Sequence, residues 1–204
     1  MPRPRLALTL GDPAGIGPEI ALRALASRQR PEAAVAVFGP VAALHERARR
    51  FGLPSVESLD ARLVDVPTAA PVPLGRVSAE GGRAAAEAVL AAVRGARAGE
   101  VDGLVTAPLN KEALAAAGYP WPGHTEMLAE AAGVSDVAMM FVGGDLRVAL
   151  LTIHRSLRSV PDALSVAETC RVVRLVAREL PRFGASRARV ALCGLNPHAG
   201  EGGL

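Results

Sequence analysis

The chain has 204 residues, of which 50% are hydrophobic and 3% aromatic, and its formal net charge is +3. This composition excludes a disordered chain, and scattered arginines with few aromatic rings argue against a nucleic-acid partner. No apolar run approaches the ~20 residues of a membrane span. The two cysteines, Cys170 and Cys193, lie far apart, as suits reduced thiols. We therefore expect a soluble, cytoplasmic protein that contacts no membrane.

Short apolar runs alternate with helical patterns along the chain. Several of the runs lack period-two alternation, which is typical of strands buried on both faces. The β-α-β-α order predicts a mostly parallel, doubly wound sheet flanked by helices. The predicted strands are Arg5–Leu10, Ala34–Phe38, Ala61–Val66, Asp102–Ala107, Val137–Val142, Arg147–Ile153 and Arg189–Leu195.

Local signals refine this pattern. Pro18 suits the first turn of a helix. Ser165 and Glu168 have the spacing of a capping box at the start of another helix. Gly143–Leu146 separates two apolar runs and predicts a β-hairpin, so we expect a mixed sheet.

The first strand leads into the glycine-rich stretch "GDPAGIGPE", Gly11–Glu19. Such a loop before a helix lets backbone N–H groups approach an anion. It matches neither the dinucleotide-binding fingerprint nor the P-loop, so a tight structural turn is the alternative interpretation. The sequence assigns this loop no chemical role.

Lys111 is the single lysine among 23 basic residues, and it follows the predicted strand Asp102–Ala107 together with Thr106 and Asn110. The carboxyl end of a strand in an α/β sheet is where ligands gather, so the amine is well placed to meet a phosphate or carboxylate. A surface lysine is the alternative. His124 or Thr125 stands at a helix N-terminus, which also favours anions, although a capping threonine beside a solvent-exposed histidine gives the same pattern.

His154 and His198 follow the predicted strands Arg147–Ile153 and Arg189–Leu195. Imidazoles at two strand ends can converge on one metal ion, whereas ordinary loop histidines fit the pattern equally. A catalytic zinc site normally has three protein ligands, and the residues alone identify no third partner.

The stretches "LTLGDPAGIGPEI", "VTAPLNKEAL", "GHTEML", "LLTIH" and "LNPHAGEGG" occur in this order along the chain. Together they resemble the 4-hydroxythreonine-4-phosphate dehydrogenase family of vitamin B6 synthesis. The resemblance implies an isocitrate/isopropylmalate-dehydrogenase-like fold, a homodimer, NAD or NADP, and a divalent metal such as Zn, Mg or Co. "TIHRSLRSV" departs from the family's usual Thr-His followed by an aliphatic residue, Pro and Leu, so the loop around His154 differs in detail.

The resemblance also assigns roles to individual residues. It implies that His154 and His198 are metal ligands, that His124 and Thr125 bind substrate, and that Lys111, at the family's usual lysine, is catalytic. We expect a first α/β domain over residues 1–125 and the start of a metal-binding domain over residues 126–204. Family members continue further, and the resemblance places the third metal-binding histidine and much of the cofactor site in that continuation. We therefore expect an amino-terminal fragment.

The reaction that the resemblance implies is metal-assisted oxidation of 4-phosphohydroxy-L-threonine by NAD(P). The resulting β-keto acid decarboxylates to 3-amino-2-oxopropyl phosphate. A related dehydrogenase of another phosphorylated hydroxy acid, such as a four-carbon sugar-acid phosphate, is one alternative. A truncated, inactive remnant is another.

Overall fold

The computed structural model describes residues 3–185, 187 and 189–203. These residues form two compact units, Met1–Val134 and Ser135–Leu204. No helix in the described part of the chain is both long and apolar enough to cross a membrane.

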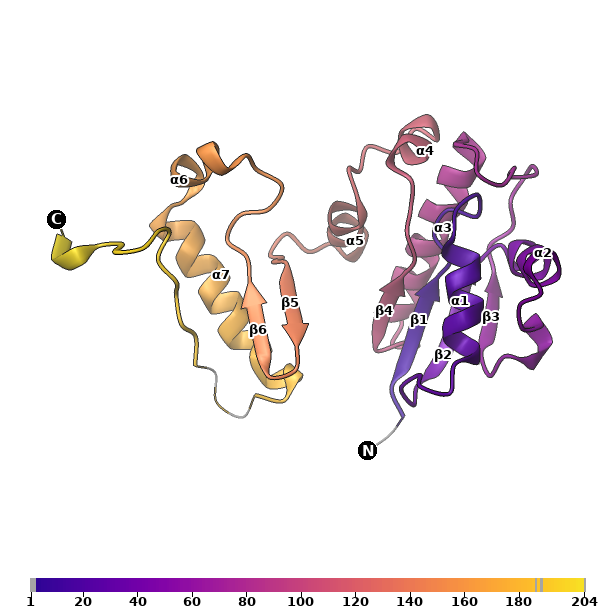
Figure 1. The fold of residues 1–204 in the computed structure, drawn as a ribbon, viewed down its shortest axis with the longest axis horizontal. Helices are drawn as coiled ribbons and strands as arrows, with labels where there is room; N and C mark the ends of the chain where they lie inside the picture. The colour runs from indigo at the N-terminus through magenta and orange to yellow at the C-terminus, as the bar shows by residue number, and fades with distance from the viewer. Residues whose placement is uncertain (1–2, 186, 188, 204) are drawn as a thin grey trace. The chain divides into compact units, whose positions relative to one another are not determined.

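The first unit contains a four-stranded parallel sheet (Figure 1). Its strand order is β3-β2-β1-β4, so the first strand of the chain lies inside the sheet. Leu6 of β1 pairs with Val35 on one side and Gly103 on the other. The four strands predicted for this part of the chain are confirmed: β1 (Arg5–Thr9), β2 (Ala34–Gly39), β3 (Arg62–Asp65) and β4 (Gly103–Thr106).

Helices cover both faces of this sheet. The helices α1 (Gly17–Ala26) and α2 (Val41–Phe51) lie on one face, and α3 (Ala79–Arg97) lies on the other (Figure 1). The side chains of β2 alternate accordingly: Val37 packs with α1 and α2, whereas Phe38 packs with α3. Burial of β2 on both faces explains why its sequence shows no period-two pattern.

Two further helices, α4 (Lys111–Ala116) and α5 (His124–Ala132), complete the first unit. Leu114 of α4 and Met127 of α5 are fully buried in one cluster with Val89 of α3. Because α5 packs on α3 in this way, the first unit extends to Val134, beyond the domain end expected after residue 125. The division into functional domains stays a prediction.

The second unit has an antiparallel hairpin of β5 (Met140–Gly143) and β6 (Leu146–Ala149), which confirms the predicted hairpin. The hairpin forms a two-stranded sheet of its own, while the larger sheet is entirely parallel. Helix α7 (Val166–Glu179) begins at the predicted cap, where the Ser165 hydroxyl accepts a hydrogen bond from the Glu168 N–H at 3.1 Å. The second unit also contains the short helices η2 (Leu157–Ser159), α6 (Val160–Ala163) and η3 (Leu180–Phe183), whereas η1 (Val56–Ser58) belongs to the first unit. The predicted class, an α/β fold with a mostly parallel sheet flanked by helices, is confirmed.

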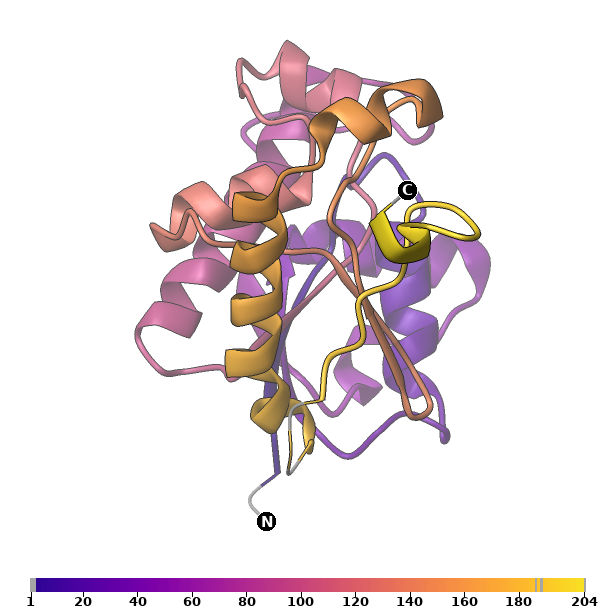
Figure 2. The same ribbon diagram turned by 90° about the vertical axis from the view of Figure 1, so that its left-hand side faces the viewer.

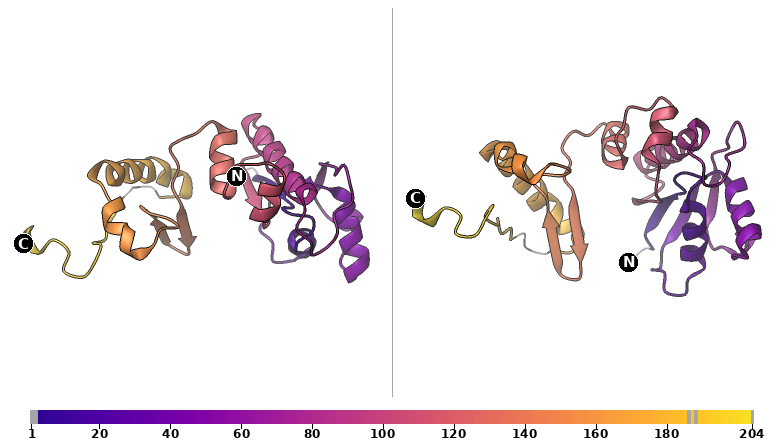
Figure 3. Two further views of the ribbon diagram at one scale, coloured as in Figure 1. Left: turned by 90° about the horizontal axis from the view of Figure 1, so that it is seen from above. Right: turned by 45° about the horizontal axis from the view of Figure 1, so that its top comes forward.

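The prediction of a strand at Arg189–Leu195 is wrong. Residues 189–200 form no strand, and the yellow segment in Figures 2 and 3 runs as coil and turns over these residues up to η4 (Glu201–Gly203). A strand exists only when a neighbour satisfies its backbone, and among the described residues β6 pairs with β5 alone. Leu192 and Leu195 are accordingly exposed.

Candidate functional site

The glycines of Gly11–Glu19 allow the loop after β1 to lie directly on the loop after β4. Gly11 has a φ of 65°, and a Cβ atom added to it would stand 2.1 Å from the carbonyl oxygen of Pro108. A Cβ on Gly17 would stand 1.9 Å from the carbonyl oxygen of Leu10. The Asp12 N–H donates to the Pro108 carbonyl at 3.1 Å. Close backbone contact therefore explains the motif, which favours the structural-turn interpretation.

A buried arginine on α2 holds the same loop from the other side. The Arg47 side chain is 1% exposed and donates to the Pro13 carbonyl at 2.6 Å. It also forms ion pairs with Glu46 and, at 3.5 Å, with Glu19. Sequence reasoning missed Arg47, because nothing distinguishes it from the other arginines until the fold buries it.

Asp12, in the loop itself, is the second buried charged residue at this place. Its carboxylate accepts a hydrogen bond from the Ala14 N–H at 2.8 Å, and burial raises the pKa of Asp12 above its ordinary value. A Cβ on Gly81 of α3 would meet the Asp12 carboxylate at 2.7 Å. Asp12 thus fills the space between the loop and the first turn of α3.

A cavity of about 330 Å³ opens at the carboxyl ends of β1 and β4. The chain leaves β1 towards β2 on one side and returns as β4 on the other, so this is the topological switch point where open α/β sheets bind ligands. The cavity is lined by the loops after β1 and β4 and by a third loop, with Asp12, Ile16, Arg76, Val77, Leu109 and Asn110 among its residues.

Lys111 is the first residue of α4 and follows Asn110, which lines this cavity. The Asn110 side chain caps the helix by accepting from the Ala113 N–H at 2.9 Å. Lys111 is exposed and, within the described residues, lies in no ion pair. A cation at a helix N-terminus opposes the helix dipole, so the helix itself gives no reason for a lysine here.

His124 and Thr125 lie in the first turn of α5. The His124 side chain is partly buried, its Nε2 atom has no hydrogen-bond partner among the described residues, and burial lowers its pKa. Buried polar atoms are normally paired, so this nitrogen is available to hydrogen-bond a ligand. Gly123 occupies the cap position, so Thr125 is not a capping threonine.

The segment before His124 is held by aromatic contacts. Tyr119 and Trp121 stack with ring centroids 5.2 Å apart. The Tyr119 hydroxyl donates to Glu87 at 2.8 Å, and the Trp121 Nε1 donates to Glu130 at 2.7 Å. These bonds tie the entry of α5 to α3 and to α5 itself, which limits the positions open to His124.

His154 and His198 share an unusual backbone conformation in the second unit. Their φ angles are 54° and 59°, and they are the only non-glycine residues in the described ranges with positive φ. Such conformations are uncommon for residues with a Cβ and gather at functional sites. The Nδ1 atom of His198 lies 2.6 Å from the Glu201 carboxylate. No group of three or more His, Cys, Asp or Glu residues in the described chain is arranged to hold a metal ion.

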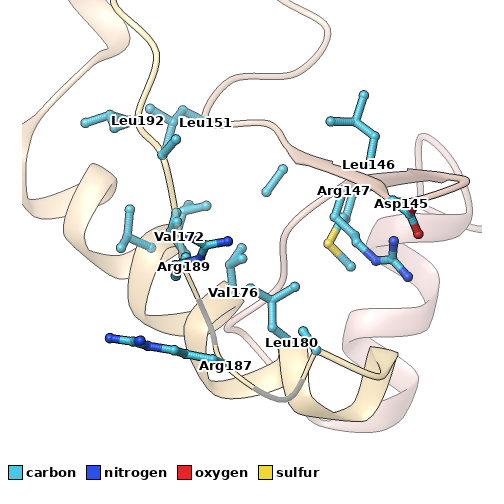
Figure 4. Close-up of a pocket in the computed structure, with 16 residues that line it drawn as sticks. Asp145, Leu146, Arg147, Leu151, Val172, Val176, Leu180, Arg187, Arg189 and Leu192 are labelled. Atoms are coloured by element: carbon cyan, nitrogen blue, oxygen red, sulfur yellow. The ribbon is translucent and has the colours of Figure 1, made fainter.

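The second unit also contains an apolar cavity of about 370 Å³ (Figure 4). The hairpin, α7 and the coil after η3 line it, with Leu146, Leu151, Val172, Val176, Leu180 and Leu192 contributing apolar side chains and Arg147, Arg187 and Arg189 positive charge. None of the candidate histidines lines this cavity. The cavity therefore lies apart from the residues predicted to bind substrate or metal.

The fold and these side chains define an α/β protein with a cavity and a candidate ligand-binding lysine where its parallel strands β1 and β4 end. The sequence model of the family described as "Pyridoxal phosphate biosynthetic protein PdxA" matches residues 20–204. The chain therefore belongs to this family.

Individual relatives agree with this assignment. A 4-hydroxythreonine-4-phosphate dehydrogenase of Chromobacterium violaceum is 41% identical over 98% of this chain. A D-threonate 4-phosphate dehydrogenase of Bordetella bronchiseptica is 39% identical over 98% of it. The crystal structure of a Klebsiella pneumoniae 4-hydroxythreonine-4-phosphate dehydrogenase superposes with a TM-score of 0.92 at 36% identity and covers 99% of this chain. This chain spans 64%, 62% and 66% of these three proteins, respectively.

Proposed function

We propose that this chain is part of a dehydrogenase that oxidises 4-phosphohydroxy-L-threonine with NAD or NADP in vitamin B6 biosynthesis. The product is a β-keto acid that loses CO₂ to give 3-amino-2-oxopropyl phosphate. The observation that carries the proposal is the 41% identity to the Chromobacterium violaceum dehydrogenase across nearly the whole chain. The whole enzyme is proposed to act as a homodimer, as the family resemblance implies.

The donor chemistry of His154 and His198 fits a divalent cation. Neutral imidazole suits zinc or cobalt, whereas magnesium prefers oxygen ligands. We therefore favour zinc or cobalt over magnesium. The strained backbone at both histidines supports a role beyond folding. The described residues offer two such donors, and we propose that the part of the relatives that this chain does not span supplies the rest. When bound, the metal supplies Lewis acidity that lowers the pKa of a substrate hydroxyl.

The first unit is proposed to hold the charged end of the substrate. Lys111 presents a positive charge, unpaired within the described structure, beside the cavity at the switch point, where it can meet a phosphate or carboxylate. Burial lowers the pKa of His124 and so favours its neutral form, whose unpaired Nε2 can exchange a hydrogen bond with substrate. Thr125 adds a hydroxyl in the same helical turn.

A second substrate is supported by the Bordetella bronchiseptica relative, whose name specifies D-threonate 4-phosphate. This molecule keeps the phosphate and the acid but has a hydroxyl in place of the amino group. The proposed roles of Lys111 and the two metal-binding histidines apply to both molecules. The alternative therefore concerns which four-carbon phosphate is oxidised.

The test is a chimera that joins residues 1–204 to the part of the Chromobacterium violaceum relative that the match leaves uncovered. NADH or NADPH formation is followed by absorbance at saturating zinc or cobalt, with each of the two substrates. We expect turnover with at least one substrate, and a preference for 4-phosphohydroxy-L-threonine. Preference for D-threonate 4-phosphate would favour the alternative, and a folded chimera that oxidises neither substrate would contradict the proposal.

A further inference from the structure

The side chains of His198 and Glu201 lie in contact within one turn. The Nδ1 atom of His198 lies 2.6 Å from the Oε1 atom of Glu201, three residues further along the chain. The backbone brings them together because His198 has a φ of 59° and Gly200 a φ of 90°. Glu201 then opens the short helix η4. The contact is therefore local and lies within the four residues His198–Glu201.

The contact decides which ring nitrogen of His198 is free. A carboxylate is negatively charged and can only accept hydrogen bonds, so its closeness favours the proton of a neutral His198 ring on Nδ1, the nitrogen that faces it. The other nitrogen, Nε2, is then left with an available lone pair. Histidines that bind metals commonly donate their second ring N–H to a carboxylate, which fixes the tautomer and the ring orientation.

His154 has no equivalent partner. Both histidines have positive φ, but the described residues place no carboxylate within ion-pair distance of His154. His45 approaches Glu57 at a longer distance, 3.5 Å, in the first unit. The short pairing is thus specific to His198 and is not a general property of histidines in this chain.

We propose that Glu201 is a positioning residue for His198: its carboxylate keeps the proton on Nδ1 and leaves Nε2 as the donor for a divalent cation. This inference rests on the proposed metal-binding role of His198. Glu201 does not touch the cation. Its contribution is to select the tautomer and to restrict rotation of a side chain that is 82% exposed.

Nuclear magnetic resonance of the ¹⁵N-histidine-labelled 204-residue chain tests the tautomer and the metal contact separately. We expect His198 to carry its proton on Nδ1 before zinc is added. Glu201→Ala should move the proton mainly to Nε2, whereas Glu201→Gln should retain the Nδ1 tautomer because the amide oxygen still accepts. Loss of the orienting carboxylate should weaken zinc binding at His198 about 10-fold, at the lower end of such effects because the pair is exposed.

Glu57→Ala is the matched control, because it removes the carboxylate beside His45 and should change neither the His198 tautomer nor its zinc affinity. A proton on Nε2 in the unchanged chain, or zinc binding at His198 unaffected by Glu201→Ala, would overturn the positioning role while leaving the metal site intact. Failure of zinc to shift the Nε2 resonance of His198 both in the unchanged chain and in the chimera would overturn the inference together with the proposed metal role.

Discussion

Replacing Gly11 with alanine tests whether contact between the loops after β1 and β4 requires glycine. The added Cβ would stand 2.1 Å from the Pro108 carbonyl oxygen and 2.8 Å from that of Ala107. Both are backbone atoms, so no side chain can rotate away. A positive φ costs an alanine about 1–2 kcal/mol, and overpacking adds about 1–3 kcal/mol. We expect Gly11→Ala to lower the free energy of unfolding by about 2–5 kcal/mol in total.

Gly52→Ala is the control, because Gly52 has a similar φ of 59° but nothing within 4 Å of its added Cβ. It should cost only the backbone part, about 1–2 kcal/mol. Urea unfolding followed by fluorescence of Trp121, the single tryptophan and a residue of the first unit, measures both variants. If Gly11→Ala costs no more than Gly52→Ala, the close approach of the two loops is not what the glycine provides.

Three further predictions concern the candidate site. Lys111→Ala should raise the free energy of unfolding by about 0.3–1 kcal/mol in urea titrations, because it removes a cation from a helix N-terminus. It should also raise the KM of the chimera for phosphorylated substrate, and an unchanged KM would favour the surface-lysine interpretation. Burial lowers the pKa of His124, so the free energy of unfolding should fall as the pH drops below the ordinary histidine pKa near 6.5. His124→Phe should reduce this pH dependence in urea titrations at pH 5 to 8. An unchanged slope of unfolding free energy against pH would show that His124 is not its source. The 204-residue chain should bind Zn²⁺ weakly by calorimetry, because the described residues form no group of three metal donors. His154→Ala should weaken this binding further. Tight binding by the unchanged chain would show that it supplies a complete metal site.

The strands of the first unit could be predicted from sequence because their apolar runs are buried between α1 and α3. The run at Arg189–Leu195 has the same character, yet it is coil. A strand requires a partner for its backbone, and a sequence pattern cannot say whether one is present. The end of the first unit was also hidden, since only the packing of Met127 on α3 shows that α5 belongs to it.

The candidate site was only partly accessible to sequence reasoning. Lys111 was found because it is the single lysine, and the histidines because they follow apolar runs. Arg47 carries no such signal, since its role depends on the fold burying it against Pro13. Glu201 had a signal, the three-residue spacing from His198, but the positive φ that makes this contact appears only in the structure.

We propose that His154 and His198 hold the metal of a dehydrogenase acting on a phosphorylated hydroxy acid. The rate of NADH or NADPH formation from 4-phosphohydroxy-L-threonine by the chimera tests this role when it is measured beside His154→Ala, His198→Ala and the control His45→Ala. We expect metal-dependent turnover by the unchanged chimera and by His45→Ala, and its loss in the other two variants. Full turnover by either His154→Ala or His198→Ala would contradict it.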